Sequence, residues 1–308
     1  MKNKKVIIGV IVVVLLAIAS FLVYFFLTRE DKITTLNLFE KQWIESNKNN
    51  VIDMSIADSI PILSYNGEGI ILDFLDSLNN ETGLAFNKVS YRLGDEVKSE
   101  YAFKLVDNVE ENQILVYTDN YVLVTKDQTF LSIESLDGLT IGVLNETLTN
   151  INNYLHNADV SYKTFENNDE LINEFNNTET DLDAIVLLKT TDLKQMIDNN
   201  YKIAFNISDY KKYYVLTLGS TERLNTILTK YYSRWSSLNY EDSYNKYLSK
   251  NYLSFKGISD EETVKFRSKR YNYGFVENAP FDTLLDNRLA GINYQLLSSF
   301  SDLTSAEI

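Results

Sequence analysis

The sequence predicts an α/β protein with three parts: an N-terminal transmembrane helix, a domain of alternating strands and helices, and the truncated start of a second copy of that domain. Three observations carry this prediction. An uncharged apolar run extends from Val6 to Leu27. Strand-like and helix-like patterns alternate between residues 51 and 257, as in mostly parallel sheets. A pattern from the first half of the chain recurs after residue 270.

The apolar run Val6–Leu27 has about 22 residues and spans roughly 33 Å as a helix, enough to cross a bilayer. Lys2, Lys4 and Lys5 precede it and should stay in the cytoplasm, so the bulk of the chain is expected outside a bacterial cell membrane, held by a single pass. The alternative is a cleaved signal peptide, since Ala17-Ile18-Ala19 resembles a cleavage site. The apolar run continues well beyond this site, which favours an uncleaved anchor within residues 1–32.

Composition excludes several function classes. The chain has 29 basic and 43 acidic residues, a formal charge of −14, which argues against a nucleic-acid partner. It has no cysteine, so disulfides, thiol catalysis, zinc–thiolate sites and the lipid-modified cysteine of a lipoprotein are absent. Its single histidine, His156, is expected to be exposed on a helix. We therefore predict no catalytic residues, no metal, no cofactor and no enzymatic activity in these residues.

The elements after the membrane segment follow from hydrophobic periodicity. Residues 33–50 contain an amphipathic linker helix over Ile33–Asn47. The domain at 51–257 should contain strands at 52–56, 84–91, 113–124 (one or two), 139–144, 160–165, 183–188 and within 202–218. Helices are expected at 69–79, 147–156, 168–176 and 221–248. Residues 258–270 are polar and charged and are expected to form a linker.

The repeat is defined by two glycines and two prolines. The interval from Gly69 to Thr82 equals that from Gly291 to Thr304, and apolar residues fall at equal offsets from both glycines. Pro61 and Pro280, the only prolines, are expected at equivalent positions. Residues 271–308 are therefore interpreted as an incomplete second domain, and the chain as the front part, a fragment, of a longer protein.

Four segments carry a resemblance to a known family, one of which, Tyr117–Val124, lies where that family has a motif before its chain crosses to the second lobe. The run Ser135-Leu-Asp-Gly-Leu-Thr-Ile-Gly-Val-Leu-Asn-Glu-Thr147 resembles the signature that opens the second lobe in bacterial extracellular solute-binding proteins of family 3. The stretches Asn168–Val186 and Pro61–Phe86 resemble later and earlier motifs of the same family. The resemblance covers about residues 50–255. It implies a two-lobed periplasmic-binding-protein-like fold of type II, which closes like a flytrap on a small molecule.

The resemblance also implies the division into lobes. Lobe 1 should comprise about 51–124 plus a C-terminal return, and lobe 2 about 133–205. Ligands of such sheets bind in the crevice at the carboxyl ends of strands. The candidate ligand-binding residues are Tyr65, Asn66, Thr118, Asp119, Tyr121, Asn145, Thr147, Thr149 and Thr190. For Asn145, Thr147 and Thr149, which precede or open a helix, capping of that helix is an equal alternative.

The sequence departs from the amino-acid binders of this family. They carry a Thr-x-x-Arg motif in lobe 1, whose arginine binds the ligand carboxylate. No such motif is present here, and the nearest arginine, Arg92, is expected on the surface. The acid that binds the amino group should follow the strand 183–188, where the sequence reads Leu187-Leu188-Lys189-Thr190. Either the ligand is of another kind, or this lobe pair has lost small-molecule binding.

The functional prediction is an extracellular sensor in signal transduction: the N-terminal part of a receptor whose output is a histidine kinase or a cyclic-di-GMP enzyme of the GGDEF/EAL type. The alternative is the substrate-binding protein of an ABC transporter. The expected partners are a small-molecule ligand and, through the N-terminal helix, the membrane; a homodimer is compatible with the sequence.

Overall fold

The computed structural model describes residues 36–127 and 132–308. The apolar run Val6–Leu27 and its expected membrane helix lie outside these residues. Within the described part of the chain, none of the helices combines the length and apolar character needed to span a bilayer. The elements below therefore concern the chain that follows the predicted anchor.

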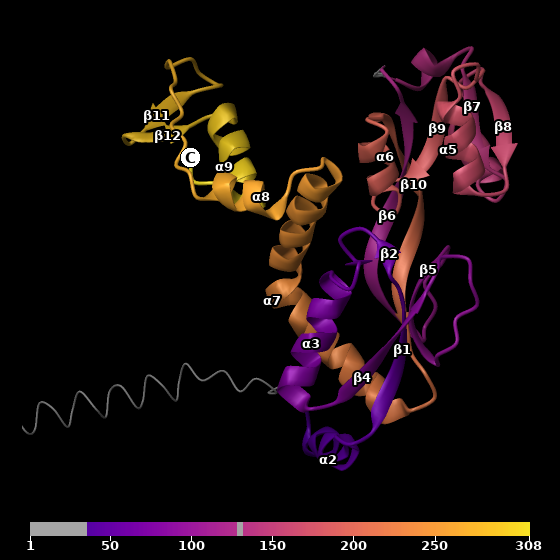
Figure 1. The fold of residues 1–308 in the computed structure, drawn as a ribbon, viewed down its shortest axis with the longest axis vertical. Coiled ribbons are helices and arrows are strands. Elements are labelled where there is room, and N and C mark those ends of the chain that lie inside the picture. The colour runs from indigo at the N-terminus through magenta and orange to yellow at the C-terminus, as the bar shows by residue number, and fades with distance from the viewer. Residues whose placement is uncertain (1–35, 128–131) are drawn as a thin grey trace, which may run out of the picture.

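One continuous eight-stranded mixed sheet forms the centre of the fold. Its strands in chain order are β1 (Val51–Ala57), β4 (Ala85–Tyr91), β5 (Tyr101–Val106), β6 (Gln113–Thr125), β7 (Thr140–Leu144), β8 (Ser161–Phe165), β9 (Ala184–Leu188) and β10 (Lys202–Thr217). Their order in the sheet is β4-β1-β5-β10-β6-β9-β7-β8 (Figure 1). The three strands at each end run parallel to one another. Two long antiparallel strands, β10 and β6, join these two parallel groups.

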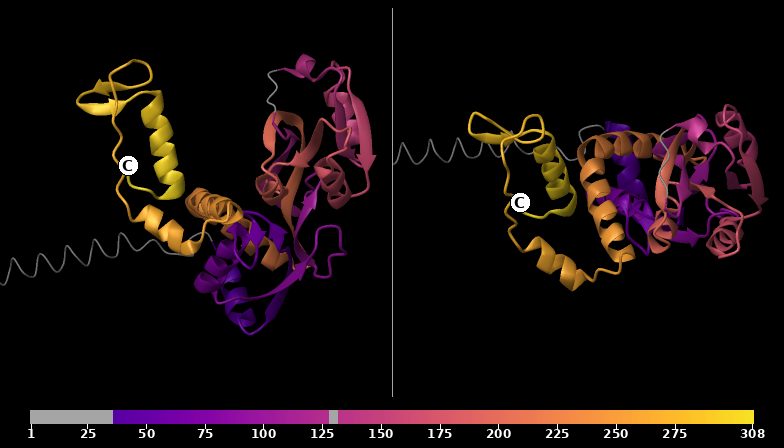
Figure 2. Two further views of the ribbon diagram at one scale, coloured as in Figure 1. Left: turned by 45° about the horizontal axis from the view of Figure 1, so that its top comes forward. Right: turned by 90° about the horizontal axis from the view of Figure 1, so that it is seen from above.

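Helices cover the two ends of the sheet as separate groups (Figure 2). Lobe 1 carries α2 (Leu38–Asn47), α3 (Ile70–Thr82) and the long α7 (Glu222–Phe255), with the short strands β2 (Ser59–Ile60) and β3 (Ser64–Tyr65). Lobe 2 carries η1 (Ile133–Leu136), α4 (Leu148–Tyr154), α5 (Asn168–Asn176) and α6 (Leu193–Asp198). All residues of β9 are buried because lobe 2 packs apolar side chains on both faces of its strands.

The core of lobe 1 is built around Phe74 of α3, which is 1% exposed. Its ring lies 5.2 Å from that of Tyr232 and 5.6 Å from that of Trp235, both on α7, and 6.5 Å from that of Phe103 on β5. Aromatic pairs of this kind contribute about 0.5–1.5 kcal/mol each beyond the burial of their surface. They fix α7 against both α3 and the sheet.

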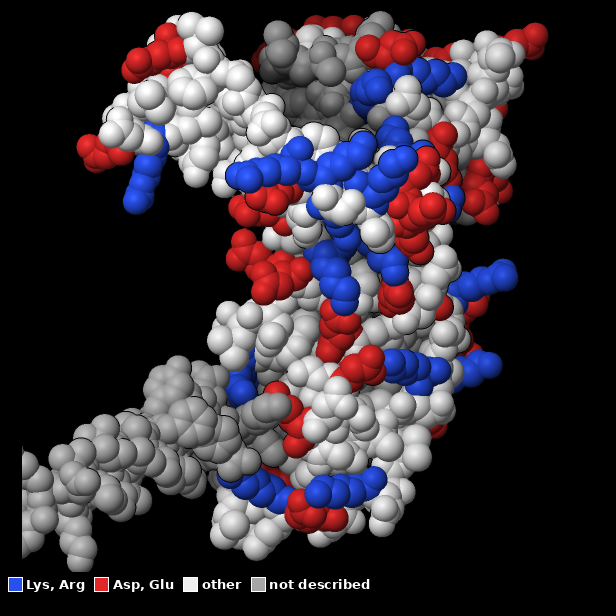
Figure 3. All heavy atoms as spheres, turned by 60° about the vertical axis from the view of Figure 1, so that its left-hand side comes forward, with Lys and Arg blue, Asp and Glu red and all other residues white. Residues whose placement is uncertain are grey.

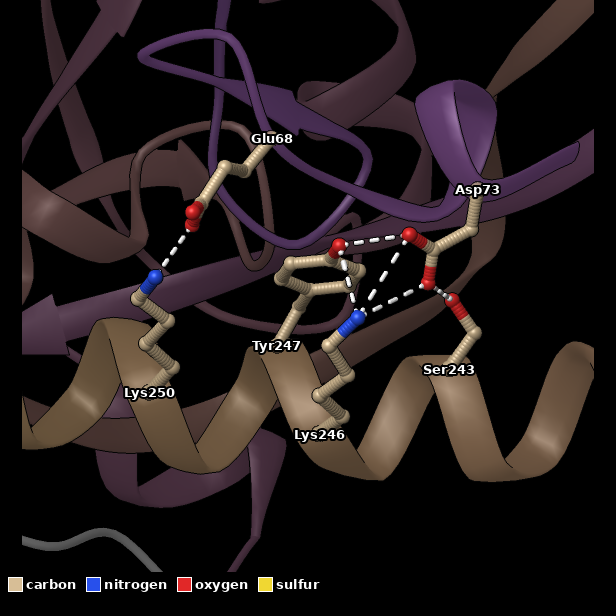
Figure 4. Close-up of polar contacts among 6 residues, drawn as sticks. All are labelled: Glu68, Asp73, Ser243, Lys246, Tyr247 and Lys250. Carbon is tan, nitrogen blue, oxygen red and sulfur yellow. Dashed lines mark hydrogen bonds and ion pairs between the residues drawn. The ribbon is translucent and has the colours of Figure 1, made fainter. Parts of the chain in front are cut away.

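Polar side chains connect α3 and the loop before it with the C-terminal half of α7 (Figure 4). Asp73 of α3 is the centre of this network. Its carboxylate accepts hydrogen bonds from Tyr247 at 2.7 Å, Ser243 at 2.8 Å and Lys246 at 3.2 Å. Glu68, in the loop before α3, pairs with Lys250 one turn further along α7. The segment of α7 from Ser243 to Lys250 is thus tied to α3 and to the loop before it by charged and hydroxyl groups.

The two central strands, β6 and β10, form the hinge between the lobes. Their pairing shifts where Ile207 faces Tyr121 and Lys211 faces Asn120, so residues 208–210 bulge from the ladder. On the lobe 1 side of this bulge, β10 pairs with β5; on the lobe 2 side, β6 pairs with β9. A pair of strands whose pairing is interrupted by a bulge is a connection about which the two lobes can rotate.

The structure confirms the alternation of strands and helices and corrects several details. Residues 113–125 form one strand, and residues 202–217 form one long strand. The strand β5 was missed, because its buried run Tyr101-Ala102-Phe103 is short and lies between charged segments. The segment 258–270, expected to be a linker, contains the helix α8 (Asp260–Arg267). Ser259 and Glu262 form a capping box that starts this helix, which the polar composition concealed.

The C-terminal residues form a small unit with β11 (Thr283–Leu285), β12 (Arg288–Ala290) and α9 (Ile292–Thr304). The start of α9 repeats that of α3. Gly69 and Gly291 both have positive φ, and a Cβ there would lie 2.3 Å and 2.4 Å from the carbonyl oxygens of Leu63 and Phe281, respectively. Only glycine allows this close approach of two backbone segments.

The ends of the two helices also match. Thr82 and Thr304 donate their hydroxyls to carbonyls one turn earlier, at 2.6 and 2.7 Å. The prolines, however, are not equivalent. The carbonyl that accepts from the first amide of the helix belongs to Ile62 in the first copy and to Pro280 in the second. Pro280 therefore corresponds to Ile62, and the expected alignment of Pro280 with Pro61 is wrong by one position.

Candidate functional site

A crevice lies at the carboxyl ends of the parallel strands of both lobes. Its volume is about 450 Å³, within the range of small-molecule sites. We call it the interlobe crevice. It is lined by Leu93, Gly94 and Leu105 of lobe 1, by Tyr121 and Lys212 of the hinge, and by Leu144, Glu146, Thr147, Glu166, Asn168, Val186, Leu187, Leu188, Thr191 and Asp192 of lobe 2. Both lobes and both hinge strands thus contribute to one site.

Lys212 crosses the interlobe crevice from the hinge strand β10. Its ammonium group lies 2.7 Å from the carboxylate of Asp107 in lobe 1 and 3.4 Å from that of Glu146 in lobe 2. Its side chain is only 14% exposed. Burial alone would lower the pKa of Lys212, but the hydrogen bond to Asp107 and the charge of Glu146 outweigh it and raise the pKa. Among the described residues, Lys212 is the one cation that lines the interlobe crevice, and it is already paired with two acids.

Asp192 is the most deeply buried ionisable group in the interlobe crevice, with 4% of its surface exposed. Its carboxylate accepts hydrogen bonds from the backbone N–H of Leu188 at 2.8 Å and from the side-chain amide of Asn168 at 2.9 Å. Burial raises the pKa of Asp192 to about 7; the negative charge of Asp119 adds to this rise, and the hydrogen bond from Leu188 opposes it. Each of its oxygens retains acceptor capacity for a ligand.

A second buried carboxylate, Asp119, anchors lobe 2 to the hinge. It accepts hydrogen bonds from the backbone N–H groups of Thr190 at 2.9 Å and Thr191 at 2.8 Å, and from the Thr191 hydroxyl at 2.8 Å. Burial raises the pKa of Asp119, although these hydrogen bonds act in the opposite direction. On the same strand, the Tyr117 hydroxyl lies 2.8 Å from that of Thr190. These contacts hold the end of β9 against β6.

The structure places the nine predicted ligand residues in different surroundings. Tyr121 and Thr147 line the interlobe crevice. Thr118, Asp119 and Thr190 lie in the hinge contact beside it, where Thr118 pairs with Tyr213. The other four predicted residues, Tyr65, Asn66, Asn145 and Thr149, do not line it. Tyr65 packs edge-on against Phe255 at 5.3 Å, Asn66 and Thr149 are exposed, and Asn145 donates to Glu166 at 2.7 Å.

Asn145, Thr147 and Thr149 were expected either to face the ligand crevice or to cap the helix α4. Thr147 occupies the N-cap position of α4, but its side chain makes no capping hydrogen bond. Its hydroxyl donates instead to the carbonyl of Leu144 at 3.0 Å, and its side chain faces the interlobe crevice. The crevice-facing interpretation therefore describes Thr147, and neither interpretation describes Asn145 or Thr149.

Sequence reasoning missed Asp192, Glu166 and Lys212. The search for an acid after β9 ended at Thr190, and Asp192 lies two residues further on, where a turn brings its carboxylate back to Leu188. Glu166 directly follows β8, and this position at a strand's carboxyl end was a usable signal. Lys212 lies in the middle of a strand and carried no signal. Arg92 is exposed, as expected.

A second hollow, of about 850 Å³, lies between the C-terminal half of α7, α8 and the end of α9. Lys246, Lys250 and Arg267 line it together with Asp242 and Asp260. Positive and negative side chains are mixed over this side of the molecule (Figure 3). We place the candidate site in the interlobe crevice, because it lies at the strand ends of a parallel sheet, whereas this hollow is a gap between helices.

Comparisons with known proteins agree with this architecture. The crystal structure of the periplasmic VFT2 domain of BvgS from Bordetella pertussis has a TM-score of 0.51 and 16% identity, covering 68% of this chain and 98% of that one. The larger BvgS periplasmic domain has a TM-score of 0.50 and 13% identity, covering 88% of this chain and 58% of that one.

An amino acid ABC transporter substrate-binding protein, AbpA from Streptococcus pneumoniae, solved with bound L-arginine, has a TM-score of 0.49 and 15% identity, covering 70% of this chain and 98% of that one. No family model and no curated protein sequence matches. The likeness to the two BvgS structures shows that this chain has a periplasmic-binding-protein-like fold of two lobes.

Proposed function

We propose that this chain is the membrane-anchored, extracytoplasmic sensory part of a transmembrane signalling receptor, and that a small molecule bound in the interlobe crevice sets the angle between its lobes. The observation that carries this proposal is the crevice itself, which both lobes and both hinge strands line. The lysine-flanked apolar run Val6–Leu27 supports the anchor and its orientation. A ligand that contacts both lobes shifts the population of a hinged pair towards closure.

We further propose that residues 271–308 open a second domain of the same kind. The matching glycine and threonine contacts of α3 and α9 support this. So does the exposure of apolar residues on α9: Leu296 and Phe300 are 68% and 44% exposed, whereas their counterparts Phe74 and Leu78 are buried. In the first copy, α7 and β5 cover the apolar face of α3. The corresponding face of α9 is therefore suited to pack against elements like α7 and β5.

The binding role can be tested on the full chain reconstituted in lipid nanodiscs. The chain has no cysteine, so Ser90→Cys on β4 and Ser161→Cys on β8, both exposed, can each take one spin label. Distances between the labels would be measured with and without small-molecule extracts of the host bacterium. An extract fraction that contains the ligand should shorten the mean distance between the labels or narrow its distribution. An unchanged distribution with every fraction would contradict the binding role.

The same cysteines test the membrane orientation and the rival role in transport. In intact cells, a membrane-impermeant maleimide should label Ser161→Cys, and absence of labelling would contradict an extracytoplasmic location. The substrate-binding protein of an ABC importer is the alternative to a receptor. It predicts that the chain binds a permease and stimulates its ATPase, whereas the receptor role predicts neither.

A further inference from the structure

The charges of the interlobe crevice point to the chemical class of its ligand, an inference that rests on the binding role proposed above. Four ionisable side chains other than tyrosine line it, and three of them, Glu146, Glu166 and Asp192, are acids. The fourth, Lys212, is paired with Asp107 and Glu146. An anionic ligand would thus enter a site whose one cation is already neutralised, next to two further carboxylates.

Three backbone donors at the strand ends beside the interlobe crevice already have acceptors within the protein. At the end of β7, the N–H of Asn145 donates to the carbonyl of Phe165 at 2.9 Å, and that of Thr147 to the carbonyl of Leu144 at 2.9 Å. The N–H of Leu188, at the end of β9, is taken by Asp192. These three N–H groups are therefore already engaged within the protein.

The hydroxyl of Tyr121 reports the sign of the electrostatic potential at the centre of the hinge. Burial raises the pKa of Tyr121, and the carboxylates of Glu146, Asp107, Asp192 and Asp119 each raise it further. A group that is harder to ionise because of surrounding carboxylates lies in a negative potential, which attracts a cation. The aromatic ring of Tyr121 adds a face on which a cation is stabilised.

Apolar side chains make up much of the remaining lining of the interlobe crevice, beside the polar Thr147, Asn168 and Thr191. Leu93 and Leu105 approach from lobe 1, and Leu144, Val186 and Leu188 from lobe 2. These side chains can cover a short hydrocarbon body but offer it no hydrogen bond. A ligand that matches the whole site therefore has an apolar body and a positively charged end directed at Asp192 and Glu166.

We propose that the interlobe crevice binds a small organic cation without a carboxylate, such as an amine or a quaternary ammonium compound. Asp192 is the principal acceptor, because it is buried and keeps free lone pairs. Glu166, which is exposed and shared with Asn145, contributes a weaker long-range attraction.

Three probes separate the alternatives: cadaverine, a five-carbon diamine; L-lysine, which adds a carboxylate to that diamine; and glutarate, a five-carbon dicarboxylate. Binding to the full chain in nanodiscs would be measured by titration calorimetry at pH 8. Cadaverine should bind at least tenfold more tightly than L-lysine, and glutarate should not bind. Asp192→Asn should weaken cadaverine at least tenfold and Glu166→Gln about threefold, while Asp169→Asn, an exposed acid on α5, should leave it unchanged.

Equal or tighter binding of L-lysine or glutarate would overturn the cation inference, as would an absence of cadaverine binding. The spin-label experiment distinguishes a wrong ligand class from the absence of any ligand binding. If extracts close the lobes and the active compound is an anion, the binding role stands and the cation inference is wrong. If neither extracts nor probes alter the distance, both are wrong.

Discussion

The ammonium group of Lys212, on a hinge strand, lies 3.4 Å from the carboxylate of Glu146 in lobe 2, and the same ammonium lies 2.7 Å from Asp107 in lobe 1. One side chain of the hinge thus links both lobes across the interlobe crevice. The two acids are largely exposed, with 66% and 71% of their side chains accessible, so each pair is worth little by itself. The contacts are placed to affect the angle between the lobes more than the stability of either.

Removal of this link should loosen the arrangement of the lobes. Lys212→Met keeps the length of the apolar stem and removes both ion pairs. We expect the spin-label distance between residues 90 and 161 to broaden and lengthen, while the free energy of unfolding falls by less than about 1 kcal/mol. Lys211→Met, at the exposed neighbouring position, is the matched control and should change neither quantity. An unchanged distance in Lys212→Met would mean that the link does not set the lobe angle.

Asp192 should make stability depend on pH. Its pKa is raised to about 7, so the folded protein holds a proton between about pH 4 and pH 7 that the unfolded chain releases. The stability associated with the protonated carboxyl is full below about pH 4 and is lost as pH rises through 7. Asp192→Asn, which stays neutral, should therefore gain about 4 kcal/mol relative to the parent between pH 4 and pH 8. Urea unfolding at several pH values would measure this gain, and parallel curves for the two proteins would contradict it.

The same carboxyl should make cation binding depend on pH. A cation favours ionised Asp192, whose fraction rises roughly tenfold between pH 6 and pH 8 for a pKa near 7. Cadaverine should accordingly bind about tenfold more tightly at pH 8 than at pH 6 and release a proton on binding at pH 7. Calorimetry in buffers of different ionisation enthalpy would detect this proton. In Asp192→Asn, the residual binding should lose its pH dependence.

Asp119 should be essential for the packing of lobe 2 on the hinge. Asp119→Ala leaves the backbone N–H groups of Thr190 and Thr191 without their acceptor in a buried place, which costs about 2–4 kcal/mol. Thermal unfolding would show this as a fall in Tm. Asp209→Ala, at the exposed bulge of β10, is the control and should lie within about 0.5 kcal/mol of the parent. A small effect of Asp119→Ala would indicate that water replaces the carboxylate.

Gly69 offers a test of the turn that the two copies share. Gly69→Ala would place a Cβ 2.3 Å from the Leu63 carbonyl oxygen at a φ of +141°, so we expect a loss of more than about 2 kcal/mol. Gly257→Ala, at a φ of +73° with open space around it, should cost only about 1 kcal/mol. Comparable losses in the two variants would show that the close backbone approach at Gly69 relaxes easily.

The sequence predicted the fold well where apolar periodicity was strong. The buried runs 139–144 and 183–188 became β7 and β9, and the stripe on residues 221–248 became most of α7. The strand β5 was missed because three buried residues between charged segments do not form a pattern. The equivalence of the two prolines was wrong by one position because only the backbone contacts at the start of α3 and α9 show which residues correspond.

The candidate site was only partly predictable. Thr147 could be placed because the end of β7 and the start of α4 can be read from the sequence, whereas Tyr121, in the middle of β6, was chosen only through the resemblance to the family. Tyr65 and Asn66 do not line the interlobe crevice, and the ring of Tyr65 packs against that of Phe255 on α7 instead. Lys212 is paired with Asp107 and Glu146, which are far away in the sequence. Asp192 is buried because an unpredicted turn brings it back to Leu188. The pairing that determines their charge and burial exists only in the folded chain.

The helix α7 has a mechanical consequence. It contains 34 residues, and at 1.5 Å per residue it is a rod of roughly 50 Å. It moves with lobe 1, because Asp73 holds it, yet near its far end the ring of Phe255 lies 5.6 Å from the ammonium of Lys194 on α6 of lobe 2. The rod therefore carries a residue of lobe 1 to the surface of lobe 2, so that a change in the angle between the lobes would alter the contact between Phe255 and Lys194.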